Sequence, residues 1–173
     1  MKLILFRHGP AGRRDARRWP DDRERPLTGI GKKRTRKAAQ GIARLEPKVS
    51  RIWTSPLVRA RETAERLAKA YDPPLKITVV DSLAPGMDPL RDLLTESRRT
   101  PDEVIALVGH EPDLGTLAGR LVGRDTSPLP LKKAGACAIA SQSPLKAGAC
   151  QLEWFLPPGE LRKLGKKKKQ EGS

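Results

Sequence analysis

The chain has 173 residues, of which 37% are apolar and 3% aromatic, and its formal net charge is +15. This length suits one domain with a sizeable core built mainly from Leu, Ile, Val and Ala, and no long linker separates a second domain. The first apolar run is only four residues long, too short for a secretory signal or a membrane span, so we expect a cytoplasmic protein without membrane insertion.

The first predicted element is a strand over residues 2–6, an apolar run that ends directly in Arg7, His8 and Gly9. Charge at the end of a buried strand calls for an explanation. The chain has one other histidine, His110, and it too follows an apolar run. Because ligand sites of open α/β sheets lie just outside the carboxyl ends of parallel strands, we expect both histidines to lie at such a site.

The remaining elements alternate between helices and strands. The expected order after the first strand is helix 29–45, strand 51–54, helix 56–71, strand 75–80, helix 89–99, strand 103–108, helix 113–122 and an antiparallel hairpin that ends at Pro157-Pro158. This alternation indicates an α/β three-layer sandwich: a mostly parallel central sheet with helices on both faces, followed by a C-terminal antiparallel hairpin.

The first two helices have recognisable buried faces and start signals. In the first, which Thr28 is expected to cap, the face comprises Ala38, Ala39, Ile42 and Leu45. The second is expected to start at Ser55-Pro56, because Ser can accept a bond from the first turn and Pro has no amide to leave unsatisfied. Its buried stripe comprises Leu57, Ala60, Ala64 and Leu67.

Arg59 lies close to the start of that second helix. A helix N-terminus attracts anions, and an arginine beside it adds a planar fork of donors suited to phosphate oxygens. Taken alone, Arg59 is better explained by a surface ion pair with Glu62 or Glu65. Together with the Arg7-His8 pair and His110, each at a junction between a strand and a helix, it predicts a phosphate pocket.

Basic residues concentrate in two segments. Residues 13–37 hold eleven basic against four acidic residues, and residues 162–173 hold six against one. We expect the second segment to be a disordered tail behind a domain that spans residues 1–161. The charge favours anionic partners. Nucleic acid is not expected, because the few aromatic residues are scattered, and a solvated basic surface explains the charge equally well.

Cys137 and Cys150 lie in a repeated KAGAC segment. The hairpin expected there could bring the two thiols close together. In a cytosolic protein both should stay reduced, and we interpret them as small strand residues. Zinc is not expected, because no Cys-x-x-Cys spacing occurs and both histidines have other candidate roles.

Three motifs, RHG at 7–9, SPLVRARET at 55–63 and GH at 109–110, resemble the histidine phosphatase superfamily, which has the phosphoglycerate mutase-like fold. The stretches DRERPLTGIG, LAPG and EWFLPPGEL are similar to its SixA-type phosphohistidine phosphatase branch. The resemblance covers residues 1–161. It implies that His8 is the nucleophile and that Arg7, Arg59 and His110 hold the phosphoryl oxygens. It implies no metal and no other cofactor, and we expect a monomer whose pocket takes phosphate or sulfate.

The sequence departs from the family pattern in two places. Larger members use a Glu after the third strand as general acid, whereas Pro85 stands about there and neither Asp81 nor Asp88 is clearly placed to replace it. After RHG, this chain has Pro10, Ala11 and Arg14 instead of further phosphate-contacting residues. Three functions stay open: a phosphatase for phosphohistidine on a protein such as a phosphotransfer domain, a phosphomonoesterase for small phosphorylated substrates that uses Asp88 or Asp81, and a non-enzymatic polyanion-binding module.

Overall fold

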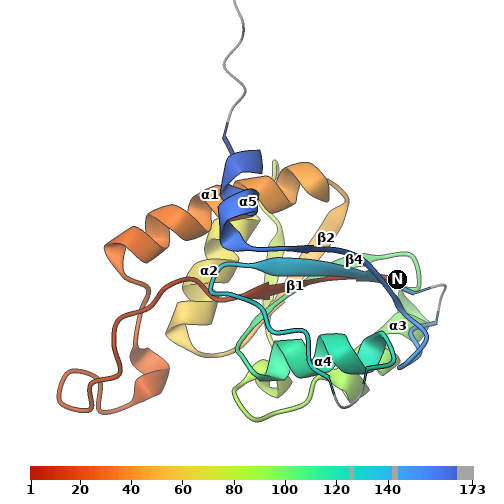
Figure 1. Cartoon of the computed structure of the whole chain (residues 1–173), viewed down its shortest axis with the longest axis horizontal. Helices are drawn as coiled ribbons and strands as arrows, with labels where there is room; N and C mark the ends of the chain where they lie inside the picture. Colours follow the sequence, from red (N-terminus) through yellow and green to blue (C-terminus); the bar gives the residue numbers. More distant parts are fainter. Residues whose placement is uncertain (125–126, 142–143, 167–173) are drawn as a thin grey trace, which may run out of the picture.

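A single six-stranded sheet with the order β3-β2-β4-β1-β5-β6 forms the centre of the computed structural model, which describes residues 1–124, 127–141 and 144–166. The strands are β1 (Lys2–Arg7), β2 (Val49–Thr54), β3 (Lys76–Val79), β4 (Val104–Gly109), β5 (Ala136–Ala140) and β6 (Gln151–Leu156). The first four run parallel, whereas β5 is antiparallel to both β1 and β6. The expected sheet and its C-terminal hairpin are therefore confirmed (Figure 1).

Helices cover both faces of the sheet. They are α1 (Gly29–Leu45), α2 (Val58–Ala68), α3 (Leu90–Arg99), α4 (Asp113–Leu121) and α5 (Pro158–Leu164), with one-turn helices η1 (Asp22–Glu24) and η2 (Asp81–Leu83). Buried side chains of α1, α2 and α5 pack on one face, and those of α3 and α4 on the other. Figure 1 shows α1 and α5 above the sheet and α3 and α4 below it.

The apolar side chains of β1 pack into both hydrophobic cores, one on each face of the sheet. Leu3 and Leu5 belong to the core under α3 and α4, and Ile4 and Phe6 belong to the core under α1 and α2. Successive residues of a strand point to opposite faces of the sheet. A central strand that is covered on both faces therefore has apolar residues at consecutive positions. The continuous apolar sequence of β1 therefore indicates that this strand lies in the centre of the sheet.

Two helix expectations needed correction. Thr28 caps α1 as expected, accepting the Gly31 N–H at 2.9 Å, but Leu45 is 37% exposed and does not share the buried face. Helix α2 begins at Val58 instead of Ser55-Pro56 and ends at Ala68. The four residues of its expected stripe, Leu57, Ala60, Ala64 and Leu67, are all buried.

The hairpin does not bring the two cysteines together. Cys137 pairs with Phe155 across the hairpin, whereas Cys150 lies next to the opposite end of β6, where Gln151 pairs with Ala140. The expectation that the thiols could come close is therefore wrong. Both cysteines are buried and free, each in contact with the core under α3 and α4.

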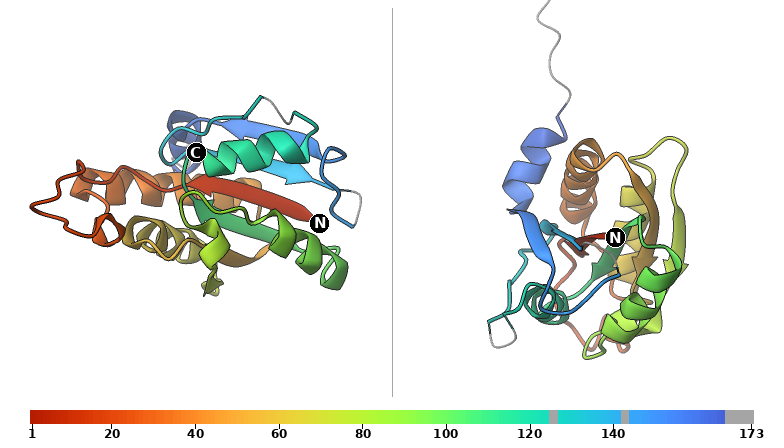
Figure 2. Two further views of the ribbon diagram at one scale, coloured as in Figure 1. Left: turned by 90° about the horizontal axis from the view of Figure 1, so that it is seen from below. Right: turned by 90° about the vertical axis from the view of Figure 1, so that its right-hand side faces the viewer.

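Helix α5 was not expected from the sequence. Its Leu161 is buried, and the carbonyl of that residue approaches α1 so closely that a Cβ on Gly41 would lie 2.1 Å from it. Figure 2 shows α5 beside α1 in its right-hand view. The helix continues past residue 161 to Leu164, and the expected basic tail lies outside the described residues from position 167 onward. Within the described ranges, no helix has the length and apolar content to cross a membrane.

Candidate active site

The register of the central strands brings the two histidines together. Arg7 at the end of β1 pairs with Gly109 at the end of β4, so His8 and His110 leave neighbouring strands at the same edge. The His8 N–H donates to the Gly109 carbonyl at 3.0 Å. The imidazole rings lie 5.0 Å apart between centroids, inclined at 54°. With exposures of 6% and 3%, both rings are buried.

The turn after β1 fixes the His8 ring. Its Nδ1 lies 2.7 Å from the Gly9 carbonyl oxygen. A carbonyl can only accept, so Nδ1 carries the proton and Nε2 keeps its lone pair. The Gly9 N–H donates to Thr63 Oγ1 of α2 at 3.1 Å, and a Cβ on Gly9 would lie 1.9 Å from Thr35 Oγ1. This close packing accounts for the glycine in the RHG motif.

Arg59 is buried in the first turn of α2, with 3% of its surface exposed. Its Nη1 donates to the Asp22 carbonyl at 2.8 Å, and its Nη2 lies 3.2 Å from the Asp22 carboxylate. The partner of Arg59 is therefore η1, which lies far away in sequence, and neither Glu62 nor Glu65 of its own helix. Its Nε is buried without a hydrogen-bond partner among the described residues.

The backbone of Leu131 links Arg7 to Glu111. Its Nη1 donates to the Leu131 carbonyl at 2.7 Å, and the Leu131 N–H donates to Glu111 Oε1 at 3.1 Å. The Nε of Arg7, like that of Arg59, is buried without a partner in the described part of the chain. Buried donors are normally paired, so these two unpaired guanidinium N–H groups are free to donate to an anion.

Three residues at the site were missed from the sequence. Ser55 Oγ lies 2.8 Å from His110 Nε2 and also accepts the Leu57 N–H at 3.3 Å, so this serine contacts both the histidine and the residue before α2. Asp22 joins Arg59 to Arg25, whose Nε donates to Asp22 Oδ1 at 2.7 Å and whose surface is 8% exposed. Both Asp22 and Arg25 lie in the DRERPLT stretch, for which the sequence alone predicts no role at the site.

The two carboxylates considered as possible general acids do not contact the site. Asp81 is exposed in η2, and Asp88 accepts from Arg120 at 2.6 Å. Within the described part of the chain, neither carboxylate contacts the two histidines, Arg7 or Arg59. The loop that follows Pro85 does approach the start of α4, since the Gly86 N–H donates to Asp113 Oδ2 at 3.0 Å.

Burial and positive neighbours keep both histidines neutral. The pKa of His8 is lowered to about 3, first by burial and then by the nearby His110, Arg59 and Arg7. The pKa of His110 is also lowered to about 3, by burial and by the same two arginines. Each effect disfavours the charged imidazolium. His8 Nε2 is therefore an unprotonated nitrogen across the neutral pH range.

We expect an NMR titration of the folded protein to show neutral imidazole shifts for both histidines from pH 8 down to about pH 5. In the unfolded chain both should titrate near the ordinary pKa of 6.5. The unfolded state then binds more protons below that value, so these residues lower the free energy of unfolding as the pH falls through 6.5. A midpoint near 6.5 in the folded protein would contradict the assigned environment.

The molecule is an α/β protein with two buried histidines and two arginines at the carboxyl edge of its sheet. The sequence profile of the histidine phosphatase superfamily (branch 1) matches residues 3–84. An uncharacterized protein of Picosynechococcus sp. is 40% identical over 144 residues, which cover 82% of this chain and 86% of the relative. The chain belongs to the histidine phosphatase superfamily, and it is therefore a phosphatase.

More distant relatives have defined activities. Phosphohistidine phosphatase SixA of Escherichia coli is 26% identical over 168 residues, 94% of this chain and 97% of that protein. The solved structure of the protein histidine phosphatase SixA complexed with tungstate matches with a TM-score of 0.78 at 22% identity, over 93% and 99% of the two chains. A phosphoserine phosphatase of Entamoeba histolytica matches with a TM-score of 0.66 at 18% identity, over 89% and 95%. The fold is thus of the SixA type, and proteins of this fold differ in substrate.

Proposed function

We propose that the protein is a phosphohistidine phosphatase in which His8 is the nucleophile. The observation that carries this assignment is the 2.7 Å contact between His8 Nδ1 and the Gly9 carbonyl, which leaves Nε2 as the free nitrogen. Arg7, Arg59 and His110 would bind the phosphoryl oxygens. Their support is the pair of unpaired buried Nε atoms and the 5.0 Å spacing of the rings.

In the proposed reaction, the lone pair of His8 Nε2 attacks phosphorus while the bond from phosphorus to the leaving group breaks on the opposite side. The product is a phosphohistidine on the enzyme, and water then attacks it to release phosphate and restore His8. Charge spreads over the equatorial oxygens in both steps. Fixed guanidinium donors stabilise that charge without reorganising, which is the main contribution a protein makes to phosphoryl transfer.

The substrate class follows from the carboxylates around the site. Asp22 pairs with two arginines, and Arg25 and Arg59 hold its pKa below the ordinary value, so it stays ionised. Burial raises the pKa of Glu111, but this carboxylate accepts the Leu131 N–H at 3.1 Å and the Gly115 N–H also faces it. Asp22 is therefore not a proton donor, and the oxygens of Glu111 are already engaged by backbone N–H groups. An imidazole leaves as a neutral molecule when its other ring nitrogen is protonated, whereas an alkoxide needs an acid, so this site favours phosphohistidine over alkyl esters.

The rates on three classes of substrate test this proposal. We expect kcat/KM to be highest for phosphohistidine, intermediate for an activated aryl phosphate and lowest for an alkyl phosphate, because the need for an acid rises in that order. Steady-state release of phosphate at equal pH and salt measures all three. Equal rates on a sugar phosphate and on phosphohistidine would favour the small-molecule phosphomonoesterase instead.

A further inference from the structure

Helix α1 carries a row of positive charge on its exposed side. Lys33, Arg36, Lys37 and Arg44 are all exposed, and α1 contains no acidic residue. Residues three, four and eleven positions apart lie on one face of a helix. We name these four residues the α1 stripe. At 1.5 Å per residue it extends about 16 Å along the helix.

The charge of the α1 stripe is not neutralised within the described part of the chain. The ion pair that α1 makes there joins Lys32 to Glu62 at 2.6 Å, beside the stripe, and no stripe residue has an acidic partner. Neighbouring elements add positive charge. A hollow of about 210 Å³ is lined by Lys32, Lys33, Arg36 and Arg66. A second, of about 470 Å³, is lined by Lys37, Gln40, Ala43, Arg44, Ala70, Gly165 and Lys166.

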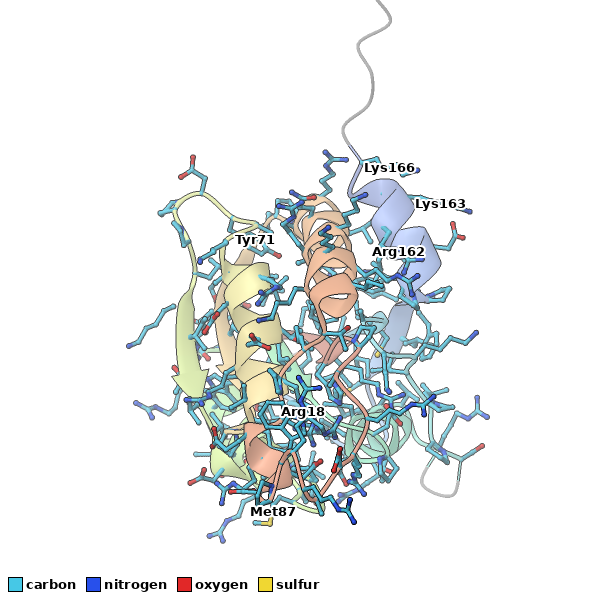
Figure 3. The ribbon with its side chains drawn as sticks, turned by 90° about the vertical axis from the view of Figure 1, so that its left-hand side faces the viewer. Arg18, Tyr71, Met87, Arg162, Lys163 and Lys166 are labelled. Atoms are coloured by element: carbon cyan, nitrogen blue, oxygen red, sulfur yellow. The ribbon has the colours of Figure 1, made fainter. Side chains whose placement is uncertain are left out.

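The stripe begins in the second turn of α1, and the start of this helix lies against the loop that follows the nucleophile. The first turn of α1 packs on the loop after His8, where the Thr28 N–H donates to the Pro10 carbonyl at 3.1 Å. A Cβ on Gly31 would lie 2.0 Å from that same oxygen. Figure 3 looks onto this edge of the molecule and shows α2, α1 and α5 side by side, with Arg162, Lys163 and Lys166 at the α5 end. Positive charge therefore extends along the exposed side of α1 as far as the end of α5.

We propose that the α1 stripe docks an acidic segment of the protein that carries the phosphohistidine, an inference that rests on the proposed function. Charge complementarity selects an acidic partner and acts mainly on its association rate. A protein segment fits better than single-stranded nucleic acid, because α1 has no aromatic side chain on which bases could stack. The proposal gives the basic segment of residues 13–37 a role in choosing the substrate.

Two matched peptides test the docking surface. Each carries one phosphohistidine with eight residues on either side, and the flanks are rich in Glu in one peptide and in Gln in the other. Eight extended residues reach about 26 Å, which exceeds the length of the stripe. At low salt we expect wild-type kcat/KM to be roughly tenfold higher for the Glu peptide, and the preference to shrink as salt is added.

The test variant is K33E/R36E/K37E, which leaves Arg44 in place because its guanidinium contacts the carbonyls of Leu164 and Lys166 at the end of α5. We expect it to lose the preference for the Glu peptide while keeping wild-type turnover of free phosphohistidine. The matched control is K76E/R91E/R98E, which removes the same charge from exposed positions on β3 and α3. Thermal melts of both variants check that the fold is intact.

The outcomes separate the docking proposal from the proposed function. If the wild-type protein does not hydrolyse free phosphohistidine, the proposed function fails. If it does, but both peptides react equally or the control variant loses the preference as fully as the test variant, the docking proposal is overturned. It is also overturned if a DNA oligonucleotide, and not the Glu peptide, depends on the α1 stripe for binding.

Discussion

The variant His8→Ala is expected to lose turnover of phosphohistidine and of an aryl phosphate by at least about a thousandfold, because no other group can take the nucleophile's place. The ring is buried, but its contacts are to the Gly9 carbonyl and to the facing His110, so the apolar cores stay filled. Steady-state phosphate release measures the loss, and a thermal melt close to that of the wild-type protein shows that the fold is kept. Substantial residual turnover would show that His8 is not the nucleophile.

Arg59→Ala and His110→Ala should each lower turnover by about a hundredfold or more, the effect of removing one preorganised donor from a developing charge. Arg59 is buried in the first turn of α2, and His110 faces His8 at 5.0 Å. Activity on the aryl phosphate, measured with each variant at saturating substrate, reports the loss. It should appear mainly in kcat, because these charges matter most in the transition state.

Arg61→Ala is the matched control for Arg59→Ala. Arg61 lies on the same helix, is exposed and makes no ion pair within the described residues. Two residues correspond to about 200° around a helix axis, so its side chain leaves on the far side from the site. Its loss should change turnover little. If Arg61→Ala proves the more damaging variant, the wrong arginine has been placed in the pocket.

The central sheet and the proximity of the two histidines could both be predicted from the sequence. Apolar runs identify strands buried on both faces, and parallel neighbours end at one edge, so His8 and His110 had to lie near each other if β1 and β4 were adjacent. The register of Arg7 with Gly109 is that arrangement. Arg59 lies in the first turn of α2, close to the start of the helix as the sequence predicts.

The remaining features depend on tertiary contacts that leave no periodic signal. The path of the loop after β1 decides that Asp22 reaches Arg59 and that Arg25 is buried, and loop residues follow no hydrophobic period. Ser55 accepts the Leu57 N–H before α2, as a capping serine would, and the sequence does not indicate that its hydroxyl also contacts His110. Helix α5 has only seven residues and one fully buried side chain, Leu161, too few for an amphipathic pattern.

The most direct test of the account is to locate the phosphate on the enzyme during turnover. Mixing the wild-type protein with labelled phosphoramidate and quenching in alkali should trap a phosphohistidine, which NMR and tandem mass spectrometry can assign to one ring nitrogen. Because His8 Nδ1 faces the Gly9 carbonyl at 2.7 Å, we expect the phosphate on Nε2 of His8 and none on the His8→Ala variant. Phosphate on Nδ1 of His8, on His110, or on no residue while turnover proceeds would contradict the mechanism.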